Sequence, residues 1–316
     1  MTEDLEIPYI KGVTFGFMTP KGSYADEAAK ESMKQLALNT GADTIILALA
    51  ALQKTAHSED VDYIGAHMPS DAEVIEMIDF AKTLGVRVIL KPMVNCVDGT
   101  WRAHINFFDK EVSCEPKWSK WFESYTVFQL HYARIAEKLG CEMVIVGCEM
   151  VQTERKADEW RNLIREVRKV YHGLISYNTD KYQEEMVSWW DAVDVISSSG
   201  YYPINAFDKE LKRIYQAILP FNKPFFFAEA GCMSTAGSSL IPNNWDLQGT
   251  INLEEQKEYY EKMFQHAKEH TWIKGFGIWD WSSHLYPKEM ASKDSKYEVY
   301  GKPACEVIRK FYTSMR

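Results

Sequence analysis

Short apolar runs and amphipathic segments alternate along the whole chain. The runs are rich in β-branched and aromatic residues, and most are nearly continuous in their apolar character. Runs of this kind are typical of strands that are buried on both faces, as in a parallel sheet. We therefore predict eight strands, at residues 12–18, 44–50, 87–94, 143–150, 173–179, 193–203, 224–231 and 273–281.

Between these runs, apolar residues recur with the period of an amphipathic helix. The segment 70–84 opens with Ser-Asp-Ala-Glu, which gives Ser70 and Glu73 the spacing of a capping box. Gly41 follows the first helical segment, as a C-terminal cap often does. The segment 181–190 is short and weakly periodic. The predicted helices cover residues 24–39, 70–84, 118–139, 157–172, 181–190, 209–218, 253–270 and 303–315.

Strict alternation of strands and helices predicts an α/β fold, a single (β/α)8 TIM barrel that spans residues 1–316. A doubly wound sheet is the alternative, but no GxGxxG follows the first strand and no GxxxxGK[ST] occurs. The chain exceeds the ~250 residues typical of a barrel. Most of the surplus lies in two loops after strands, residues 95–116 and 232–252. Both belong to the face where barrel enzymes have their active sites.

Composition narrows the classes of partner. The net charge of −9 and the absence of a basic stripe argue against nucleic acid as a partner. No apolar run approaches the ~18 residues of a membrane helix, so no membrane partner is expected. The six cysteines form no CxxC pair, and the first residues lack the pattern of a signal peptide. We expect a cytoplasmic protein, although secretion of a longer form stays open.

Two strands end in glutamate. MVIVGCEM at 143–150 places Glu149 after four apolar residues and a Gly-Cys pair, and PFFFAEAG at 224–231 likewise ends an apolar run with Glu229. Burying an unpaired carboxylate costs several kcal/mol, so each residue either forms a structural ion pair or has a function. The matched pair on the fourth and seventh strands favours function.

Barrel geometry brings the two carboxyls close together. Eight tilted strands give a radius of roughly 7.5 Å, so the fourth and seventh strands are roughly 14 Å apart. Two inward side chains then leave roughly 6 Å between the carboxyls, near the spacing of a retaining glycosidase. The unusually many aromatic residues, among them 10 Trp and 17 Tyr, suit the binding of sugar rings.

At this point the sequence resembles the retaining glycoside hydrolase clan whose catalytic glutamates end the fourth and seventh strands. Within this clan it is most similar to glycoside hydrolase family 113, the β-1,4-mannanases. The resemblance covers essentially the whole chain and rests on LKPMV at 90–94, DGTWR at 98–102, GCEM at 147–150, SYN at 176–178, FAEAG at 227–231 and GIWDW at 277–281. It implies that Glu149 is the general acid/base and Glu229 the nucleophile.

The resemblance also implies roles for residues around this pair. Trp279 and Trp281 stand where the clan has an aromatic floor, and both face the site if the strand alternates regularly. A tyrosine after the sixth strand binds the nucleophile in this clan, and we favour Tyr202 over Tyr201. One departure is Cys148, which replaces an asparagine that binds a sugar hydroxyl. Hydroxyl recognition then falls to another residue, for which Asn178 is our candidate.

Five further candidates come from the residues themselves. Lys91 ends an apolar run, so its ammonium needs either a substrate hydroxyl or a structural ion pair with a loop acid. Trp101 and Arg102 lie in the loop 95–116 and are expected to line a subsite or to be solvated. Asn243 and Trp245, in the loop 232–252, leave the same two options open.

The resulting hypothesis is a retaining glycoside hydrolase that acts on β-1,4-mannan or manno-oligosaccharides. A β-glycosidase for gluco- or galacto-configured substrates is the second hypothesis, and a non-catalytic carbohydrate-binding barrel is the third. No cofactor is expected. His266 and His270 have a spacing that metal ligands use, but they lack the HExxH pattern, so we expect no metal site.

Overall fold

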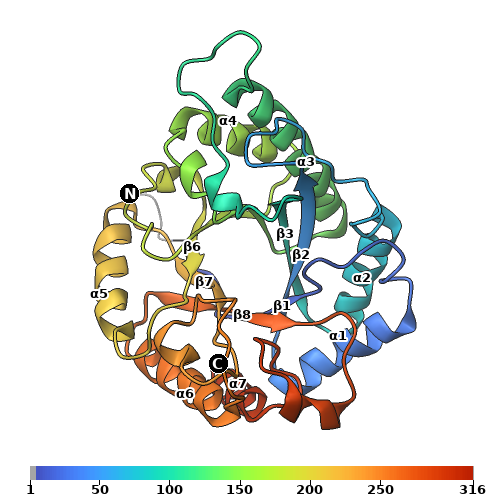
Figure 1. Cartoon of the computed structure of the whole chain (residues 1–316), viewed down its shortest axis with the longest axis vertical. Coiled ribbons are helices and arrows are strands. Elements are labelled where there is room, and N and C mark those ends of the chain that lie inside the picture. Colours follow the sequence, from blue (N-terminus) through green and yellow to red (C-terminus); the bar gives the residue numbers. More distant parts are fainter. Residues whose placement is uncertain (1–4, 316) are drawn as a thin grey trace.

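The computed structural model describes residues 5–315, and its centre is a closed barrel of eight parallel strands in chain order. Figure 1 shows the helices arranged in a ring around this barrel. This confirms the predicted (β/α)8 fold. The strands are β1 (Ile10–Phe15), β2 (Thr44–Gln53), β3 (Arg87–Cys96), β4 (Met143–Cys148), β5 (Leu174–Thr179), β6 (Val195–Ser199), β7 (Phe225–Ala230) and β8 (Ile273–Trp281).

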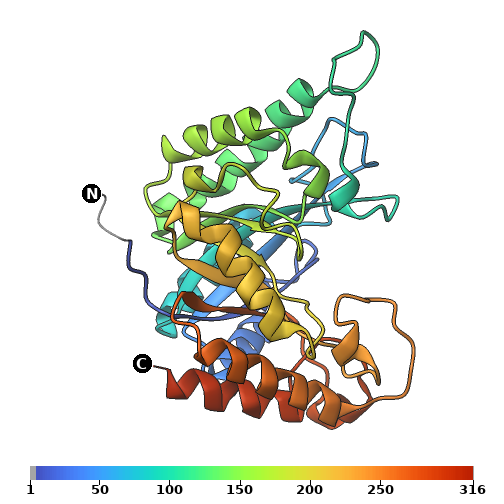
Figure 2. The same cartoon turned by 90° about the vertical axis from the view of Figure 1, so that its left-hand side faces the viewer.

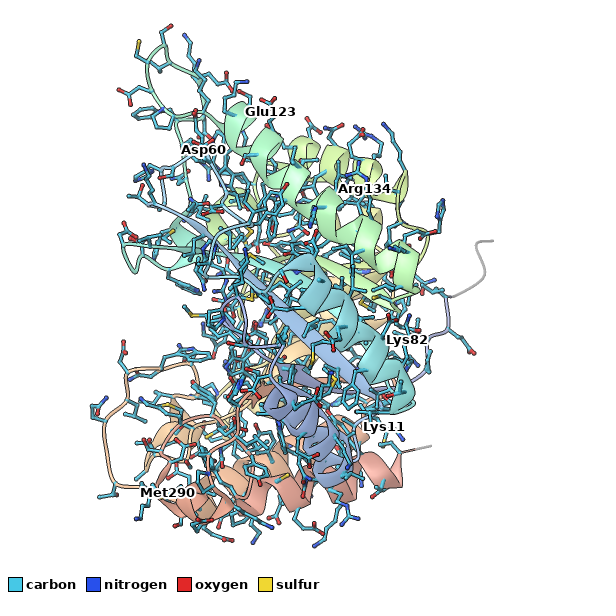
Figure 3. All side chains as sticks on the ribbon, turned by 90° about the vertical axis from the view of Figure 1, so that its right-hand side faces the viewer. Lys11, Asp60, Lys82, Glu123, Arg134 and Met290 are labelled. Atoms are coloured by element: carbon cyan, nitrogen blue, oxygen red, sulfur yellow. The ribbon has the colours of Figure 1, made fainter. Side chains whose placement is uncertain are left out.

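Long helices follow most of the strands, and their apolar faces pack on the outside of the barrel. Charged side chains such as Lys82, Glu123 and Arg134 point away from it (Figure 3). The helices are α1 (Glu27–Thr40), α2 (Asp71–Thr83), α3 (Trp118–Leu139), α4 (Ala157–Arg168), α5 (Phe207–Ile218), α6 (Leu253–Lys268) and α7 (Pro303–Ser314).

The predicted helix ends are confirmed at two places. The Ser70 hydroxyl accepts a hydrogen bond from the Glu73 amide, and the Glu73 carboxylate accepts one from the Ser70 amide, which completes the capping box of α2. Gly41 ends α1 with φ at 68°, a left-handed conformation that glycine adopts without a steric penalty.

One predicted helix is wrong. The segment 181–190 between β5 and β6 consists of turns, followed by the 3₁₀ helix η3 (Trp190–Ala192). The indoles of Trp189 and Trp190 donate to the carbonyls of Glu154 and Glu184 and are buried. Aromatic packing and side-chain hydrogen bonds therefore cover this side of the barrel in place of a helix.

The core has two layers, inside and outside the barrel. The interior layer contains alternate residues of the strands, such as Ile145 on β4 and Phe226 on β7, whereas their neighbours Val144 and Phe227 face the helices. The loops after β3 and β7 project from the same side of the molecule in Figure 2. This side is the carboxyl end of the strands, where the interior layer gives way to polar side chains.

Candidate active site

Glu149 directly follows β4, and its backbone turns sharply there. Between β4 and β5 the register shifts, because Ile145 pairs with Ser176 but Cys148 pairs with Asn178. The extra residue on β4 turns Cys148 into the barrel. Glu149 then adopts φ of 53°, a left-handed conformation that costs a residue with a side chain about 1 kcal/mol. The strained backbone therefore lies at the position where the Glu149 carboxylate enters the barrel interior.

Two side chains fix the Glu149 carboxylate, which is only 6% exposed. Arg102 donates from Nη2 to Oε2 at 2.8 Å, and the Ser199 hydroxyl donates to Oε1 at 2.6 Å. Arg102 belongs to the 3₁₀ helix η1 (Arg102–His104) in the loop after β3 and also binds the Cys148 carbonyl at 3.0 Å. The loop after β3 therefore determines the orientation of Glu149.

Glu229 reaches the same space from β7 through a second register shift. Ser198 pairs with Phe227 and Ser199 with Glu229, so that one extra residue on β7 brings Glu229 onto the inward face next to Ala228. The carboxylate is 1% exposed. Regular alternation from the outward-facing Phe227 would have turned Glu229 away from the interior.

Three donors surround the Glu229 carboxylate. Lys91 donates to Oε1 at 2.5 Å, the Cys148 thiol to the same oxygen at 3.2 Å, and the Tyr201 hydroxyl to Oε2 at 2.9 Å. Burial alone raises the pKa of this carboxyl. The charges of Lys91 and Arg102, together with the hydrogen bonds, outweigh burial and hold the pKa of Glu229 below its usual range. The carboxylate is thus ionised, as a nucleophile must be.

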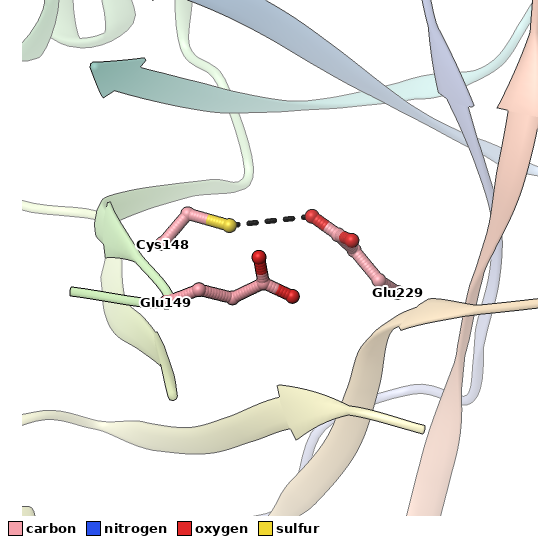
Figure 4. Close-up of side chains that lie close together, drawn as sticks. All are labelled: Cys148, Glu149 and Glu229. Atoms are coloured by element: carbon pink, nitrogen blue, oxygen red, sulfur yellow. Dashed lines mark hydrogen bonds between the residues drawn. The ribbon is translucent and has the colours of Figure 1, made fainter. Parts of the chain in front are cut away.

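The two carboxylates face each other across the barrel (Figure 4). Ligand atoms of Cys148, Glu149 and Glu229 all lie within 4.8 Å of one another. The carboxyl oxygens therefore approach more closely than the roughly 6 Å obtained from ideal barrel geometry. A separation this short fits a retaining glycosidase, in which one carboxylate attacks the sugar while the other protonates the leaving group, and not the ~6.5–9.5 Å of an inverting enzyme.

A cavity of about 350 Å³ opens above the pair. Trp101, which is 41% exposed, and Trp279 give it aromatic walls, and Asp180 and Lys181 add a charged edge. Burial and the nearby charge of Glu149 raise the pKa of Asp180 to about 7, against the effect of Lys181. The lining residues are Phe17, Trp101, Arg102, Glu149, Asp180, Lys181, Tyr201, Glu229, Asn243, Trp245 and Trp279.

Comparison with known proteins identifies the family to which this arrangement belongs. The family model described as Glycoside Hydrolase Family 113 matches residues 13–302. The chain belongs to glycoside hydrolase family 113.

Solved members of family 113 superpose closely on the structure. A family 113 β-1,4-mannanase, solved as a complex, is 57% identical with a TM-score of 0.97, and the match covers 98% of this chain and 100% of that chain. A family 113 β-mannanase from Alicyclobacillus acidocaldarius in complex with ManMIm is 38% identical with a TM-score of 0.95, covering 99% of this chain and 100% of that chain. A search of curated proteins gave no match.

More distant structures share the barrel alone. The β-glucuronidase of Ruminococcus gnavus is 14% identical with a TM-score of 0.64, and the match covers 97% of this chain but 50% of that chain. Within residues 5–315, no helix has the length and apolar character needed to cross a membrane.

The structure corrects two predicted residues of this family 113 enzyme. Tyr202 does not contact Glu229, because its hydroxyl donates to the buried carboxylate of Glu184, and the hydrogen bond to Glu229 comes from Tyr201. Trp281 lies outside the cavity, fully buried, and its indole donates to Ser32 at 3.1 Å. A third register shift, in which Ile278 pairs with Val13 but Trp281 with Phe15, turns Trp281 outward while Trp279 stays at the site.

Two other predicted substrate-binding residues lie beneath the cavity floor. Lys91 and Asn178 are fully buried and are bound to each other at 2.8 Å. Asn178 also donates to the Thr179 carbonyl and to the Ser199 hydroxyl. The Asn178 side chain therefore supports Lys91 and Ser199, and through them the two carboxylates. Arg102 and Trp101 line the cavity, which is one of the two options left open for the loop after β3.

Sequence reasoning missed several residues of the site. Phe17, Asp180 and Lys181 line the cavity, and Ser199 binds Glu149. Each of these residues ends or follows a strand. The rule that barrel active sites lie at the carboxyl ends of the strands could therefore have pointed to them. Their polar or aromatic character alone did not distinguish them from other loop residues.

The triad Cys148, Glu149 and Glu229 has the compactness of a metal site, and it is the one such group found in residues 5–315. Its chemistry does not fit a metal. The ammonium of Lys91 and the guanidinium of Arg102 already donate to the two carboxylates. Burial, together with the charge of Glu229, raises the pKa of the Cys148 thiol, which opposes the thiolate that a metal would bind.

Proposed function

We propose that this family 113 enzyme is a retaining β-mannanase, which cleaves β-1,4-mannosidic bonds in mannan or manno-oligosaccharides. The observation that carries the proposal is the approach of the Glu149 and Glu229 carboxylates to within 4.8 Å at the base of an aromatic cavity. The two relatives that superpose on almost the whole chain are described as a β-1,4-mannanase and a β-mannanase.

The donors around each carboxylate support separate roles. Glu229, ionised between Lys91 and Tyr201, attacks the anomeric carbon and forms a glycosyl-enzyme. Glu149, which lies at the cavity wall, protonates the leaving oxygen and then accepts a proton from the water that releases the sugar. In this proposal Glu149 is the acid/base and Glu229 the nucleophile.

The cavity supplies the contacts that hold the sugar. Trp279 offers an aromatic face, and its buried indole N–H has no acceptor within residues 5–315, so it is left to a substrate hydroxyl. Trp101 and Arg102 on one side and Asn243 and Trp245 on the other bound the cleft. The cytoplasmic location remains a prediction. A cytoplasmic enzyme would meet short manno-oligosaccharides as substrates rather than polymeric mannan.

Product analysis on mannotetraose and cellotetraose tests the proposal, with wild type beside Glu149→Ala and Glu229→Ala. We expect mannotetraose alone to be cleaved, the β anomer to appear first, and both variants to be nearly inactive. Cleavage of cellotetraose instead would favour the gluco-configured alternative. Saturable binding of either sugar without product would favour a binding protein.

A further inference from the structure

Lys91 occupies an unusual place for a lysine. Its side chain on β3 is 0% exposed, and its ammonium donates to Glu229 at 2.5 Å and to the neutral Asn178 amide oxygen at 2.8 Å. The ring centroid of Trp279 lies 5.9 Å away. Arg102, the second cation that binds the carboxylate pair, donates to Glu149. The counter-charge of Lys91 is therefore the carboxylate that becomes the nucleophile.

The covalent step of the proposed mechanism, on which this inference rests, removes that counter-charge. An oxygen of Glu229 forms a bond to the anomeric carbon while the bond from this carbon to the leaving oxygen breaks. The leaving oxygen takes the proton of Glu149. Glu229 is now a neutral ester, and the negative charge lies on Glu149, which Arg102 binds. Lys91 loses its directly bound anion and keeps the neutral Asn178 amide as its remaining hydrogen-bond acceptor. A buried charge that loses its partner is strongly destabilised.

We propose that Lys91 destabilises the glycosyl-enzyme and thereby accelerates its hydrolysis. In the second step a water oxygen bonds to the anomeric carbon and gives a proton to Glu149. The bond from the anomeric carbon to Glu229 breaks, and its electron pair returns to the carboxylate. The ion pair with Lys91 re-forms as this bond breaks, so the transition state is stabilised relative to the intermediate. The intermediate consequently does not accumulate in the wild-type enzyme.

Pre-steady-state kinetics with a dinitrophenyl β-manno-oligoside test this inference. Such a leaving group departs without help from an acid, which makes the first step fast. We expect wild type to release dinitrophenol without a burst. Lys91→Met should give a burst that approaches one equivalent per enzyme and a steady-state rate at least about tenfold lower. Intact-protein mass spectrometry should detect the added glycosyl unit in this variant.

The matched control is Lys212→Met on α5, where the replaced side chain is 69% exposed and forms an ion pair on the surface. It should behave as wild type does. A full burst in the wild-type enzyme would overturn the inference. So would a Lys91→Met enzyme that still turns over the substrate but shows neither a burst nor a glycosylated form.

A second measurement needs no substrate. Glu229→Gln neutralises the partner of Lys91 as glycosylation does, so we expect its thermal unfolding midpoint to fall by about 5–10 °C. The double variant Lys91→Met/Glu229→Gln should recover most of this loss. Equal midpoints for Glu229→Gln and wild type would contradict the charge argument. If wild type fails to cleave manno-oligosaccharides, the proposed function fails, while this unfolding comparison still tests Lys91.

Discussion

At the scale of single residues, the hydroxyls of two adjacent tyrosines have different roles, one in catalysis and one in stability. Tyr201 donates to Glu229, whereas Tyr202 donates to Glu184, which Arg213 also binds at 2.9 Å. A hydrogen bond to a charged group contributes about 1.5–3 kcal/mol, so we expect Tyr201→Phe to lower kcat about 10- to 100-fold. Steady-state kinetics on mannotetraose measure this effect.

Tyr202→Phe is the matched control for that prediction. It leaves the cavity intact but removes one partner of the buried Glu184, so we expect near-normal kcat and a loss of about 1–2 kcal/mol in the free energy of unfolding. An inactive Tyr202→Phe enzyme with normal stability would contradict the assignment of the two tyrosines.

Glu154 provides a pH-dependent term in stability. It is buried next to β5, where Tyr177 and Thr179 donate to one oxygen, and the other oxygen has no partner within residues 5–315. Burial raises the pKa of Glu154 to about 8, despite these two hydrogen bonds. Between the unfolded pKa of about 4.3 and pH 8, the folded state binds more protons here than the unfolded state does. Stability from this group is therefore present below pH 4 to 5 and is lost as the pH rises towards 8.

An amide at this position mimics the protonated acid. We expect Glu154→Gln to match wild type near pH 4 and to exceed it by about 4 kcal/mol in the free energy of unfolding near pH 8. Urea denaturation at both pH values measures this difference, with the exposed Glu261→Gln on α6 as a control. Parallel pH profiles for wild type and Glu154→Gln would show that Glu154 is ionised in the folded protein.

The sequence predicted those site residues that end a strand. It was less informative for residues whose role depends on contacts with distant parts of the chain. Glu149 and Glu229 were found because a charge after an apolar run needs an explanation. Lys91 was singled out by the same argument, but its partner belongs to β7, far away in the sequence. The choice between Tyr201 and Tyr202 depended on which side chain turns inward after β6. A sequence pattern does not carry that information.

At the scale of strands and helices, register shifts explain the side-chain orientations that the periodicity of the sequence did not predict. All eight strands were found from apolar runs, with differences at their ends. The extra residues in β4 and β7 turn Cys148 and Glu229 inward, and that in β8 turns Trp281 outward. Regular alternation gives the opposite orientation at these positions. The shifts lie at the carboxyl ends of the strands, where they direct catalytic side chains at the cost of ideal pairing.

The capping box of α2 joins this helix to the loop after β1. Besides capping Ser70, the Glu73 carboxylate accepts hydrogen bonds from the amides of Gly22 at 2.8 Å and Tyr24 at 3.1 Å. We expect Ser70→Ala to cost about 1 kcal/mol in the free energy of unfolding, as the loss of a cap does. Glu73→Ala should cost at least about 2 kcal/mol, because two loop amides also lose their acceptor.

Urea denaturation of these two variants measures the order of the effects. Glu73→Gln is an informative control, since its amide keeps one acceptor oxygen and loses the charge. A Ser70→Ala variant that is less stable than Glu73→Ala would mean that the cap, and not the link to the loop, provides most of the stabilisation.

Across the entire barrel, the seam between the first and last strands depends on the C-terminal helix. β1 pairs with β8, and the Tyr312 hydroxyl on α7 donates to the carbonyls of Gly12 at 2.8 Å and Phe276 at 3.2 Å, one on each of these strands. α7 also packs between α1 and α6. The contact between Tyr312 and Gly12 joins residues 300 positions apart. The alternation of elements predicts that the barrel closes, but it does not predict this contact.

One hydroxyl bridges both strands of the seam, so Tyr312→Phe should cost about 1–2 kcal/mol in the free energy of unfolding. We expect kcat to stay unchanged, because the active site lies at the other end of the strands.

Removal of residues 303–316 should cost far more stability, because it uncovers apolar side chains of α1, α6 and β8. We expect the truncated chain to lose its cooperative unfolding transition. Urea denaturation followed by both fluorescence and circular dichroism distinguishes these outcomes. A truncated chain that unfolds in one sharp transition and still cleaves mannotetraose would mean that β1 and β8 close the barrel without α7.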